Sequence, residues 1–199
     1  MSVFQSTLPQ QLATLHHTQE QAAALPLEVW AMDESRFGLQ TVRRRRLTLR
    51  GVKPVGRYQH AYENFYLYGA VAPRTGAGFF EARLKLDSDQ FQAFLDALST
   101  TYPDTFNVLI LDNARAHRAT TLQLPANVAL LFQPPYAPEL NPCERVWLAL
   151  KDDLAWRCFA DVSALQDALA LTLAALTPDA LQSLTAYPYL TLALYAQLL

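Results

Sequence analysis

The chain of 199 residues is poor in cysteine and carries no large excess of either charge. Its two cysteines form no CxxC pair and have no histidine at zinc-finger spacing, which disfavours a disulfide framework and favours a reducing, cytoplasmic compartment. Sixteen basic against 18 acidic residues give a net charge of -2, which argues against an unspecialised basic nucleic-acid coat. Bulk charge alone favours a small-molecule enzyme. Because 51% of the residues are hydrophobic, the chain can bury an ordinary core, and a disordered tail is excluded.

Neither end of the sequence carries an export or membrane signal. Polar Gln and His residues interrupt the first 25 residues, where a signal peptide needs an apolar core. The last 20 residues have no charged side chain, but Gln, Ser, Thr and Pro break the run, so a buried terminal helix is expected there. The sequence therefore predicts a protein with no membrane partner.

The hydrophobic pattern predicts a helix at 6–25, ended by Pro26, and then a change from strands to helices. Strands are expected at 29–32, 47–49, 65–71 and 79–86, the last from its strict alternation. A helix follows behind Asp87 and Ser88, either of which can cap it. Aliphatic runs at 108–111 and 128–132 are typical of central parallel strands buried on both faces. Further helices are expected at 144–157, at 162–176 and from 178 onward.

This order predicts a single α/β domain with a mixed sheet flanked by helices. The first three strands are expected to be antiparallel and the later strands parallel. We divide the chain into an N-terminal linker helix, residues 1–28, and one domain with C-terminal helices, residues 29–199.

Three carboxylates lie at the ends of predicted elements. Asp33 follows the first strand, Asp112 follows a central strand, and Glu144 opens a helix. The carboxyl ends of parallel strands meet at one edge of a sheet, where like charges repel unless a cation lies between them. Mg²⁺ prefers such oxygen ligands, and two ions roughly 3.5–4 Å apart can hold both reacting oxygens of a phosphoryl displacement. Taken singly, each acid can also be no more than a turn former or a helix cap.

Three motifs carry a family resemblance. LDNARAH at 111–117, followed by PPYAPELNPCERVW at 134–147, resembles the catalytic core of DDE transposases of the mariner superfamily, in its bacterial insertion-sequence branch. DESRFG at 33–38 resembles the first motif of the same family, so the resemblance runs from about residue 29 to 156. It implies a ribonuclease-H-like fold and a DNA strand transferase dependent on two Mg²⁺ ions, with Mn²⁺ able to substitute. The implied catalytic and metal-binding acids are Asp33, Asp112 and Glu144.

Several neighbours of these acids have candidate auxiliary roles. Asn113 and His117 are candidates for contacting phosphate or for ordering the acids, although a structural hydrogen bond is the commoner role for such a histidine. Asn141 is expected to cap the helix that carries Glu144. Glu34 is either a spare ligand or a solvated neighbour of the site, and the second interpretation is favoured.

Half of the basic residues lie between 36 and 57, and no acid occurs between Glu34 and Glu63. A basic hairpin next to the first acid is predicted to bind DNA phosphates, with a solvated charged tip as the alternative. The predicted DNA-binding residues are Arg43, Arg44, Arg45, Arg46, Arg50, Lys53 and Arg57. Among the aromatic residues, Tyr58, Tyr62 and Tyr136 are expected to be exposed and the others mostly core.

The resemblance also implies double-stranded DNA as substrate, namely transposon ends and a TA target, and a homodimer in the DNA complex. No helix-turn-helix is found before residue 29, so end recognition is expected from a separate helix-turn-helix polypeptide or from an upstream reading frame, or it is lost. The protein is expected to associate with the nucleoid when bound to DNA. Two alternatives stay open: a non-catalytic remnant that binds DNA or a partner, and a metal-dependent DNA nuclease without strand transfer. The remnant is favoured by the 31 residues between Asp112 and Glu144, fewer than is usual in the family.

Overall fold

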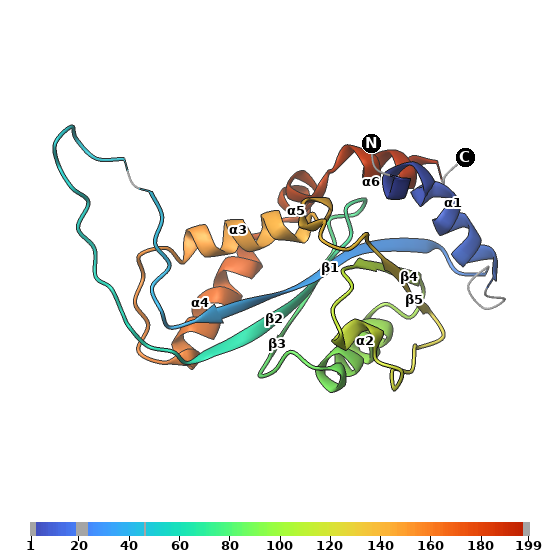
Figure 1. Cartoon of the computed structure of the whole chain (residues 1–199), viewed down its shortest axis with the longest axis horizontal. Coiled ribbons are helices and arrows are strands. Elements are labelled where there is room, and N and C mark those ends of the chain that lie inside the picture. The colour runs from blue at the N-terminus through green and yellow to red at the C-terminus, as the bar shows by residue number, and fades with distance from the viewer. Residues whose placement is uncertain (1–2, 19–23, 46, 197–199) are drawn as a thin grey trace.

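The computed structural model describes residues 3–18, 24–45 and 47–196. Their centre is one five-stranded sheet in the order β3-β2-β1-β4-β5 (Figure 1). The strands are β1 Leu27–Gly38, β2 Asn64–Val71, β3 Gly78–Arg83, β4 Phe106–Leu111 and β5 Val128–Phe132. The helices are α1 Val3–Thr18, α2 Ser88–Thr101, α3 Cys143–Asp153, α4 Val162–Ala175, α5 Pro178–Thr185 and α6 Pro188–Tyr195, with short 3-10 turns η2 Ala116–Arg118 and η3 Pro138–Leu140.

Strand β1 joins the antiparallel and the parallel part of the sheet. Residues 27–31 pair with β4 in parallel, whereas residues 31–38 pair with β2 in antiparallel register. The pairs β2–β3 and β4–β5 are antiparallel and parallel, respectively. The predicted mixed sheet is therefore confirmed.

The position of Asp33 in the first strand differs from the prediction. The strand does not end there but continues for five residues to Gly38. Its pairing with β4 ends at Ala31 of β1, whereas its pairing with β2 continues to Gly38. Asp33 therefore lies just beyond the parallel pairing, on a strand held from one side only. This local opening of the sheet gives its side chain room to line a cavity.

Several other predicted boundaries are corrected. Residues 47–49 form no strand, and Leu47 and Leu49 project into solvent. The strand at 79–86 ends at Arg83, and β5 is an edge strand with only its first two residues buried. The terminal helix is broken in two at Pro188, which cannot continue the hydrogen-bonding ladder. The first helix begins at Val3, and residues 19–23 of the predicted span lie outside the described residues.

The two faces of the sheet are covered by different helices. Alternate residues of β1 point to opposite faces, so Val29 and Ala31 pack under α1 and α3 to α6, whereas Trp30 and Met32 pack against α2. Asp87 caps α2 by accepting a hydrogen bond from the backbone of Gln90, as predicted. Among the described residues, no helix combines the length and the apolar character needed to span a bilayer.

Candidate active site

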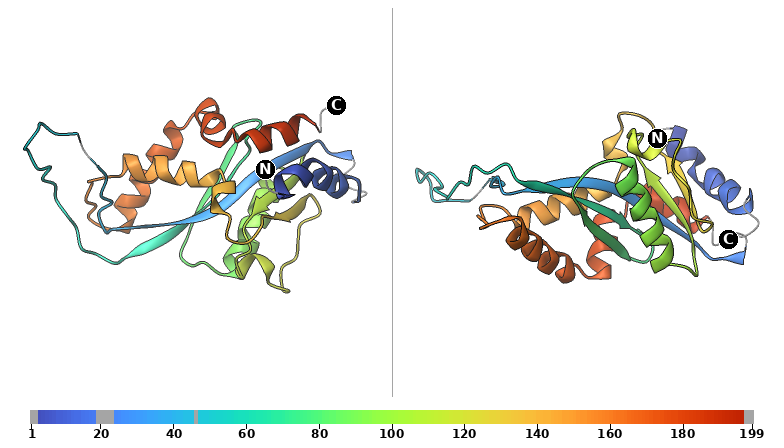
Figure 2. Two further views of the ribbon diagram at one scale, coloured as in Figure 1. Left: turned by 45° about the horizontal axis from the view of Figure 1, so that its top comes forward. Right: turned by 90° about the horizontal axis from the view of Figure 1, so that it is seen from below.

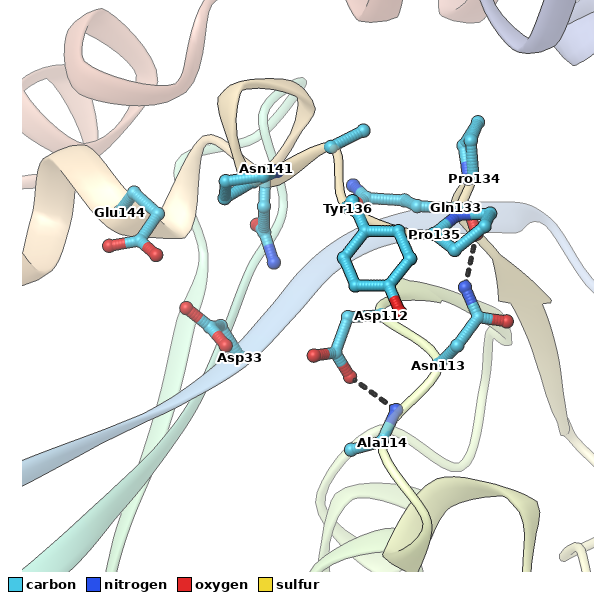
Figure 3. Close-up of a pocket in the computed structure, with 12 residues that line it drawn as sticks. Asp33, Asp112, Asn113, Ala114, Gln133, Pro134, Pro135, Tyr136, Asn141 and Glu144 are labelled. Atoms are coloured by element: carbon cyan, nitrogen blue, oxygen red, sulfur yellow. Dashed lines mark hydrogen bonds between the residues drawn. The ribbon is translucent and has the colours of Figure 1, made fainter.

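Asp33, Asp112 and Glu144 line one cavity of about 410 Å³ at the carboxyl end of the parallel strands. Asp33 lies on β1, Asp112 directly follows β4, and Glu144 is in the first turn of α3. In Figure 3 the carboxylates of Asp33 and Glu144 point toward one another, and that of Asp112 points into the same space from the other side. The structure thus brings together the three acids that the sequence placed at element ends.

Asp33 is held by a tryptophan of α3. Trp147 Nε1 donates a 2.8 Å hydrogen bond to Asp33 Oδ2. Gly69, the partner of Asp33 in β2, makes this possible, since a Cβ there would come within 2.4 Å of the Trp147 ring. Burial raises the pKa of Asp33 to about 7, with the charges of Glu34 and Glu144 adding to the rise and the Trp147 hydrogen bond opposing it.

Asp112 has the opposite environment. Its side chain is 59% exposed, yet Oδ1 accepts two hydrogen bonds of 2.9 Å, from the backbone nitrogen of Ala114 and from His117 Nδ1. The His117 hydrogen bond is the main cause that lowers the pKa of Asp112, and burial opposes it. Asp112 is therefore a fixed, ionised carboxylate with one oxygen committed to the protein.

His117 is buried between two carboxylates. Its Nε2 lies 2.8 Å from Glu34 Oε1, and its ring packs against Phe91 of α2 with centroids 4.4 Å apart. Burial works to lower the pKa of His117, but the hydrogen bonds and charges of Asp112 and Glu34 outweigh it and raise the pKa to about 9. At neutral pH the ring is an imidazolium that donates from both nitrogens.

The interpretation of Glu34 as solvated was wrong. Its side chain is 7% exposed. Neighbouring residues of a strand point to opposite faces, so Asp33 meets α3 while Glu34 meets η2 and its histidine. The sequence shows only that the two acids are adjacent, and it does not show that they face opposite sides of the sheet.

Asn141 joins the start of α3 to β1. Its Nδ2 donates to the Met32 carbonyl at 2.8 Å, and its Oδ1 accepts from the backbone nitrogen of Cys143, the first helical residue, at 3.1 Å. The predicted capping role is corrected: Pro142 occupies the cap position, and Asn141, one residue earlier, contacts the backbone of Cys143 instead. Asn141 therefore fixes where Glu144 leaves the helix relative to the strand that carries Asp33.

Both the nitrogen and the oxygen of the Asn113 side-chain amide form hydrogen bonds within the protein. Its Nδ2 donates to the Gln133 carbonyl at 2.6 Å, and its Oδ1 accepts from Arg118. These contacts tie the end of β4 to the end of β5. Asn113 thus orders the edge of the sheet.

The sequence does not predict the contacts that Trp147 and Glu34 make beside the acids. Trp147 was interpreted as core, although its position three residues after Glu144 places both on one helix face. Glu34 was named but given the wrong surroundings. Trp147 is buried as expected, and the hydrogen bond of its indole to Asp33 is the additional finding.

The donor set of the cavity fits a hard divalent cation. All three acids offer carboxylate oxygens, and Asp33 is a largely buried acid near the charges of Glu34 and Glu144. In the described part of the chain, no three or more His, Cys, Asp or Glu side chains are arranged to hold a metal ion by themselves. Mg²⁺ commonly takes only one or two carboxylates and completes its shell with water and phosphate oxygens.

The predicted basic hairpin is a long loop, residues 39–63, which we call the basic loop. It extends away from the sheet in all views (Figures 1 and 2). Its base is anchored to the segment after α3: Trp156 donates from its backbone nitrogen to Val42 and from Nε1 to Arg44, which pairs with Asp152. Beyond this base no strand pairing is present among the described residues, and the side chains from Leu47 to Tyr58 are exposed.

The predicted DNA-binding residues lie along this loop, most of them exposed. Arg43, Arg45, Arg50, Lys53 and Arg57 are exposed to differing degrees, Arg44 is half-buried in its ion pair, and Arg46 lies outside the described residues. Tyr58, Tyr62 and Tyr136 are 45%, 75% and 100% exposed, as predicted. Tyr136, on the rim of the cavity, has a φ of 58°, a conformation that costs a non-glycine residue about 1–2 kcal/mol.

The sheet order, with its antiparallel and parallel halves and helices on both faces, defines a ribonuclease-H-like fold. The chain belongs to the DDE superfamily endonuclease family, whose model matches residues 28–166.

Comparison with individual proteins finds one relative in sequence and several in fold. An uncharacterised protein of Sinorhizobium fredii, y4pE/y4sA, is 40% identical over 98 residues, which are 48% of this chain and 73% of that protein. The fold is similar to that of the Mos1 strand transfer complex, with a TM-score of 0.62, 14% identity and 99% of this chain covered. The Mos1 mariner paired-end complex with Mn gives a TM-score of 0.63 and 15% identity, again over 99% of this chain. The chain spans about three fifths of the length of these Mos1 chains.

Proposed function

We propose that this protein is the catalytic domain of a transposase that cuts DNA at the ends of an insertion sequence and joins them to TA target sites. The observation that carries the proposal is the lining of a single cavity by Asp33, Asp112 and Glu144, which come from three separate elements. Membership of the DDE superfamily endonuclease family supports this type of chemistry. In this proposal the catalytic domain is residues 29–199, and residues 1–28, which include α1, are the segment that leads into it.

In this proposal the three acids hold divalent cations, Mg²⁺ or Mn²⁺. When bound, the cations would neutralise the charge of the scissile phosphate and activate the attacking hydroxyl group. Similar Mos1 complexes are described with Mn and with Mg, which supports divalent cations here by analogy of fold. The chain's own contribution is to fix one oxygen each of Asp33 and Asp112, so that the other oxygen faces the cavity.

DNA is proposed to approach along the basic loop. Its arginines and lysine are mostly exposed and have the charge needed to hold phosphates. Tyr136 is proposed to stack on a base at the cavity, because its ring is fully exposed and its backbone is held in an unfavourable conformation. Asn113, His117 and Asn141 are assigned to ordering the site, since their side chains contact the protein.

The assembly belongs to the same proposal. Similar Mos1 structures are described as paired-end and strand transfer complexes, which supports a homodimer acting on two transposon ends. Recognition of the end sequence is assigned to a separate helix-turn-helix polypeptide or frame, and the protein is placed in the cytoplasm, at the nucleoid when DNA-bound.

The test is a reaction of the full chain with Mn²⁺ or Mg²⁺, a duplex carrying the element's ends and a plasmid with TA sites. We expect nicked ends and products joined at TA. Nicking without joined products would leave a metal-dependent nuclease, and no nicking at all would leave the non-catalytic remnant. Asp112→Asn should abolish cleavage while preserving the melting temperature, and cleavage that survives this change would remove Asp112 from the mechanism.

A further inference from the structure

The contacts of His117 extend the site beyond the three acids. The ring lies between Asp112 Oδ1 and Glu34 Oε1, at 2.9 and 2.8 Å, and its side chain is 1% exposed. Phe91 covers the ring from α2, so the histidine is fixed on one side by packing and at both nitrogens by carboxylates. A ring restrained in this way leaves the carboxylate of Asp112, to which it is hydrogen-bonded, little freedom to rotate.

The consequence for Asp112 follows from its own exposure. This side chain is 59% exposed, and an exposed aspartate ordinarily samples several rotamers. Here Oδ1 is held both by His117 and by the backbone nitrogen of Ala114, and Oδ2 is left to face the cavity that it shares with Asp33. The order of the carboxylate therefore comes from these two hydrogen bonds, one of them from a buried side chain, and not from packing around the acid.

Glu34 supplies the anchor of this arrangement. It lies on β1 directly after Asp33, but on the opposite face of the sheet. Its contact with His117 connects the strand that carries one acid to the loop that carries the other, although β1 and β4 have stopped pairing at Ala31 and Ile110. The two hydrogen bonds of His117 thus span the opening in the sheet next to the cavity.

We propose that Glu34 and His117 are positioning residues that hold Asp112 in the orientation needed to bind a divalent cation. This inference rests on the proposed function of the cavity and adds two residues to it. The residues that orient metal ligands typically change metal affinity or activity by 10–100-fold when they are replaced.

Two substitutions of His117 separate positioning from bulk structure. In His117→Asn the amide nitrogen takes the place of Nδ1 and keeps a donor for Asp112, whereas in His117→Gln it takes the place of Nε2 and keeps a donor only for Glu34. Both leave a small polar side chain at the same buried position. Glu34→Gln is the third variant, which retains the shape of the anchor but removes its charge.

The measurement is the dissociation constant for Mn²⁺, determined by calorimetry on the full chain, together with the Mn²⁺ concentration that gives half-maximal nicking. We expect both quantities to rise at least tenfold in His117→Gln and severalfold in Glu34→Gln, with His117→Asn closer to the wild type. Trp30→Phe is the matched control, since it removes a buried ring hydrogen bond of 2.9 Å, to Asn107, away from the cavity. Mn²⁺ binding should not change in this control.

Failure of the proposed function and failure of the positioning role give different results. A wild-type chain that neither binds Mn²⁺ nor nicks DNA contradicts the proposed function. If the wild type does both, and His117→Gln and His117→Asn bind Mn²⁺ equally well, the positioning role is overturned and the proposed function stands. An equal loss of Mn²⁺ binding in Trp30→Phe also overturns it, because the effect is then one of stability.

Discussion

The cavity and the basic loop differ in how their charged groups are held. In the cavity, Asp33 and Asp112 each accept a hydrogen bond from a buried ring, and Asn141 ties the start of α3 to β1. In the basic loop, the cations between residues 47 and 58 are exposed and extend into solvent. We therefore expect function to depend on geometry in the cavity, whereas charge alone should be sufficient in the basic loop.

Substitutions that keep the charge but change the geometry are the strongest test of this contrast. Asp33→Glu adds one methylene and moves the carboxylate by about 1 Å, which should lower cleavage of an end-bearing duplex about 100-fold or more. Arg50→Lys keeps the charge of an exposed residue and should leave the rate within about twofold of the wild type. Equal cleavage by the two variants would contradict the claim that the cavity depends on geometry and the basic loop on charge.

Removal of charge from the basic loop should have the next largest effect. The triple variant with Arg50, Lys53 and Arg57 changed to Ala should weaken DNA binding about 30-fold at low salt, because the loop then neutralises fewer phosphates and releases fewer counterions. The slope of log Kd against log salt concentration should fall by about one for each phosphate that is no longer neutralised. Fluorescence anisotropy at several salt concentrations measures both. An unchanged salt slope would show that the loop does not meet phosphate, and melting temperatures should match the wild type because the side chains are exposed.

The buried ring beside Asp33 should matter less than the acid itself. Trp147→Phe removes the 2.8 Å hydrogen bond but keeps most of the packing over Gly69. Cleavage should fall about tenfold, as expected when the hydrogen-bond donor to a metal-binding acid is removed. Trp30→Phe, which removes a comparable hydrogen bond elsewhere in the core, controls for stability. Equal rates in the two variants would mean that Trp147 is only a packing residue.

The smallest effect concerns stability in the absence of metal. The pKa of Asp33 is about 7 in the fold, above its ordinary value of 3.8, so the unfolded chain loses this proton first. Stability from this group is therefore present at low pH and is lost as the pH rises toward and through 7. Asp33→Asn removes this loss and should raise the free energy of unfolding by about 1 kcal/mol at pH 8, and by less at pH 5. Urea titrations in EDTA measure the difference, and a variant less stable than the wild type at pH 8 would contradict the cause assigned to the shift.

Most elements of the fold could be predicted from periodicity. The aliphatic runs and the 3.6-residue pattern located β4, β5, α2, α3 and α4, because burial on one or two faces requires apolar residues at regular positions in the sequence. The length of β1 could not be predicted, since its second half is stabilised by pairing with β2 and has no apolar run of its own. The strand predicted at 47–49 was wrong because apolar residues alternate there, but no partner strand is present among the described residues to pair with it.

The acids of the cavity could be located from the sequence, but their surroundings could not. Element ends and the three motifs indicated Asp33, Asp112 and Glu144. The contacts of Glu34 and Trp147 depend on which face of the sheet each side chain occupies and on the space above Gly69. Such contacts join residues 83 and 114 positions apart in the chain, which local patterns do not encode.

The most direct test of the central claim is an anomalous diffraction map from crystals of the full chain grown with Mn²⁺. We predict Mn²⁺ in the cavity lined by Asp33, Asp112 and Glu144, with His117 still hydrogen-bonded to Asp112. An empty cavity at a Mn²⁺ concentration that supports DNA cleavage would contradict this prediction.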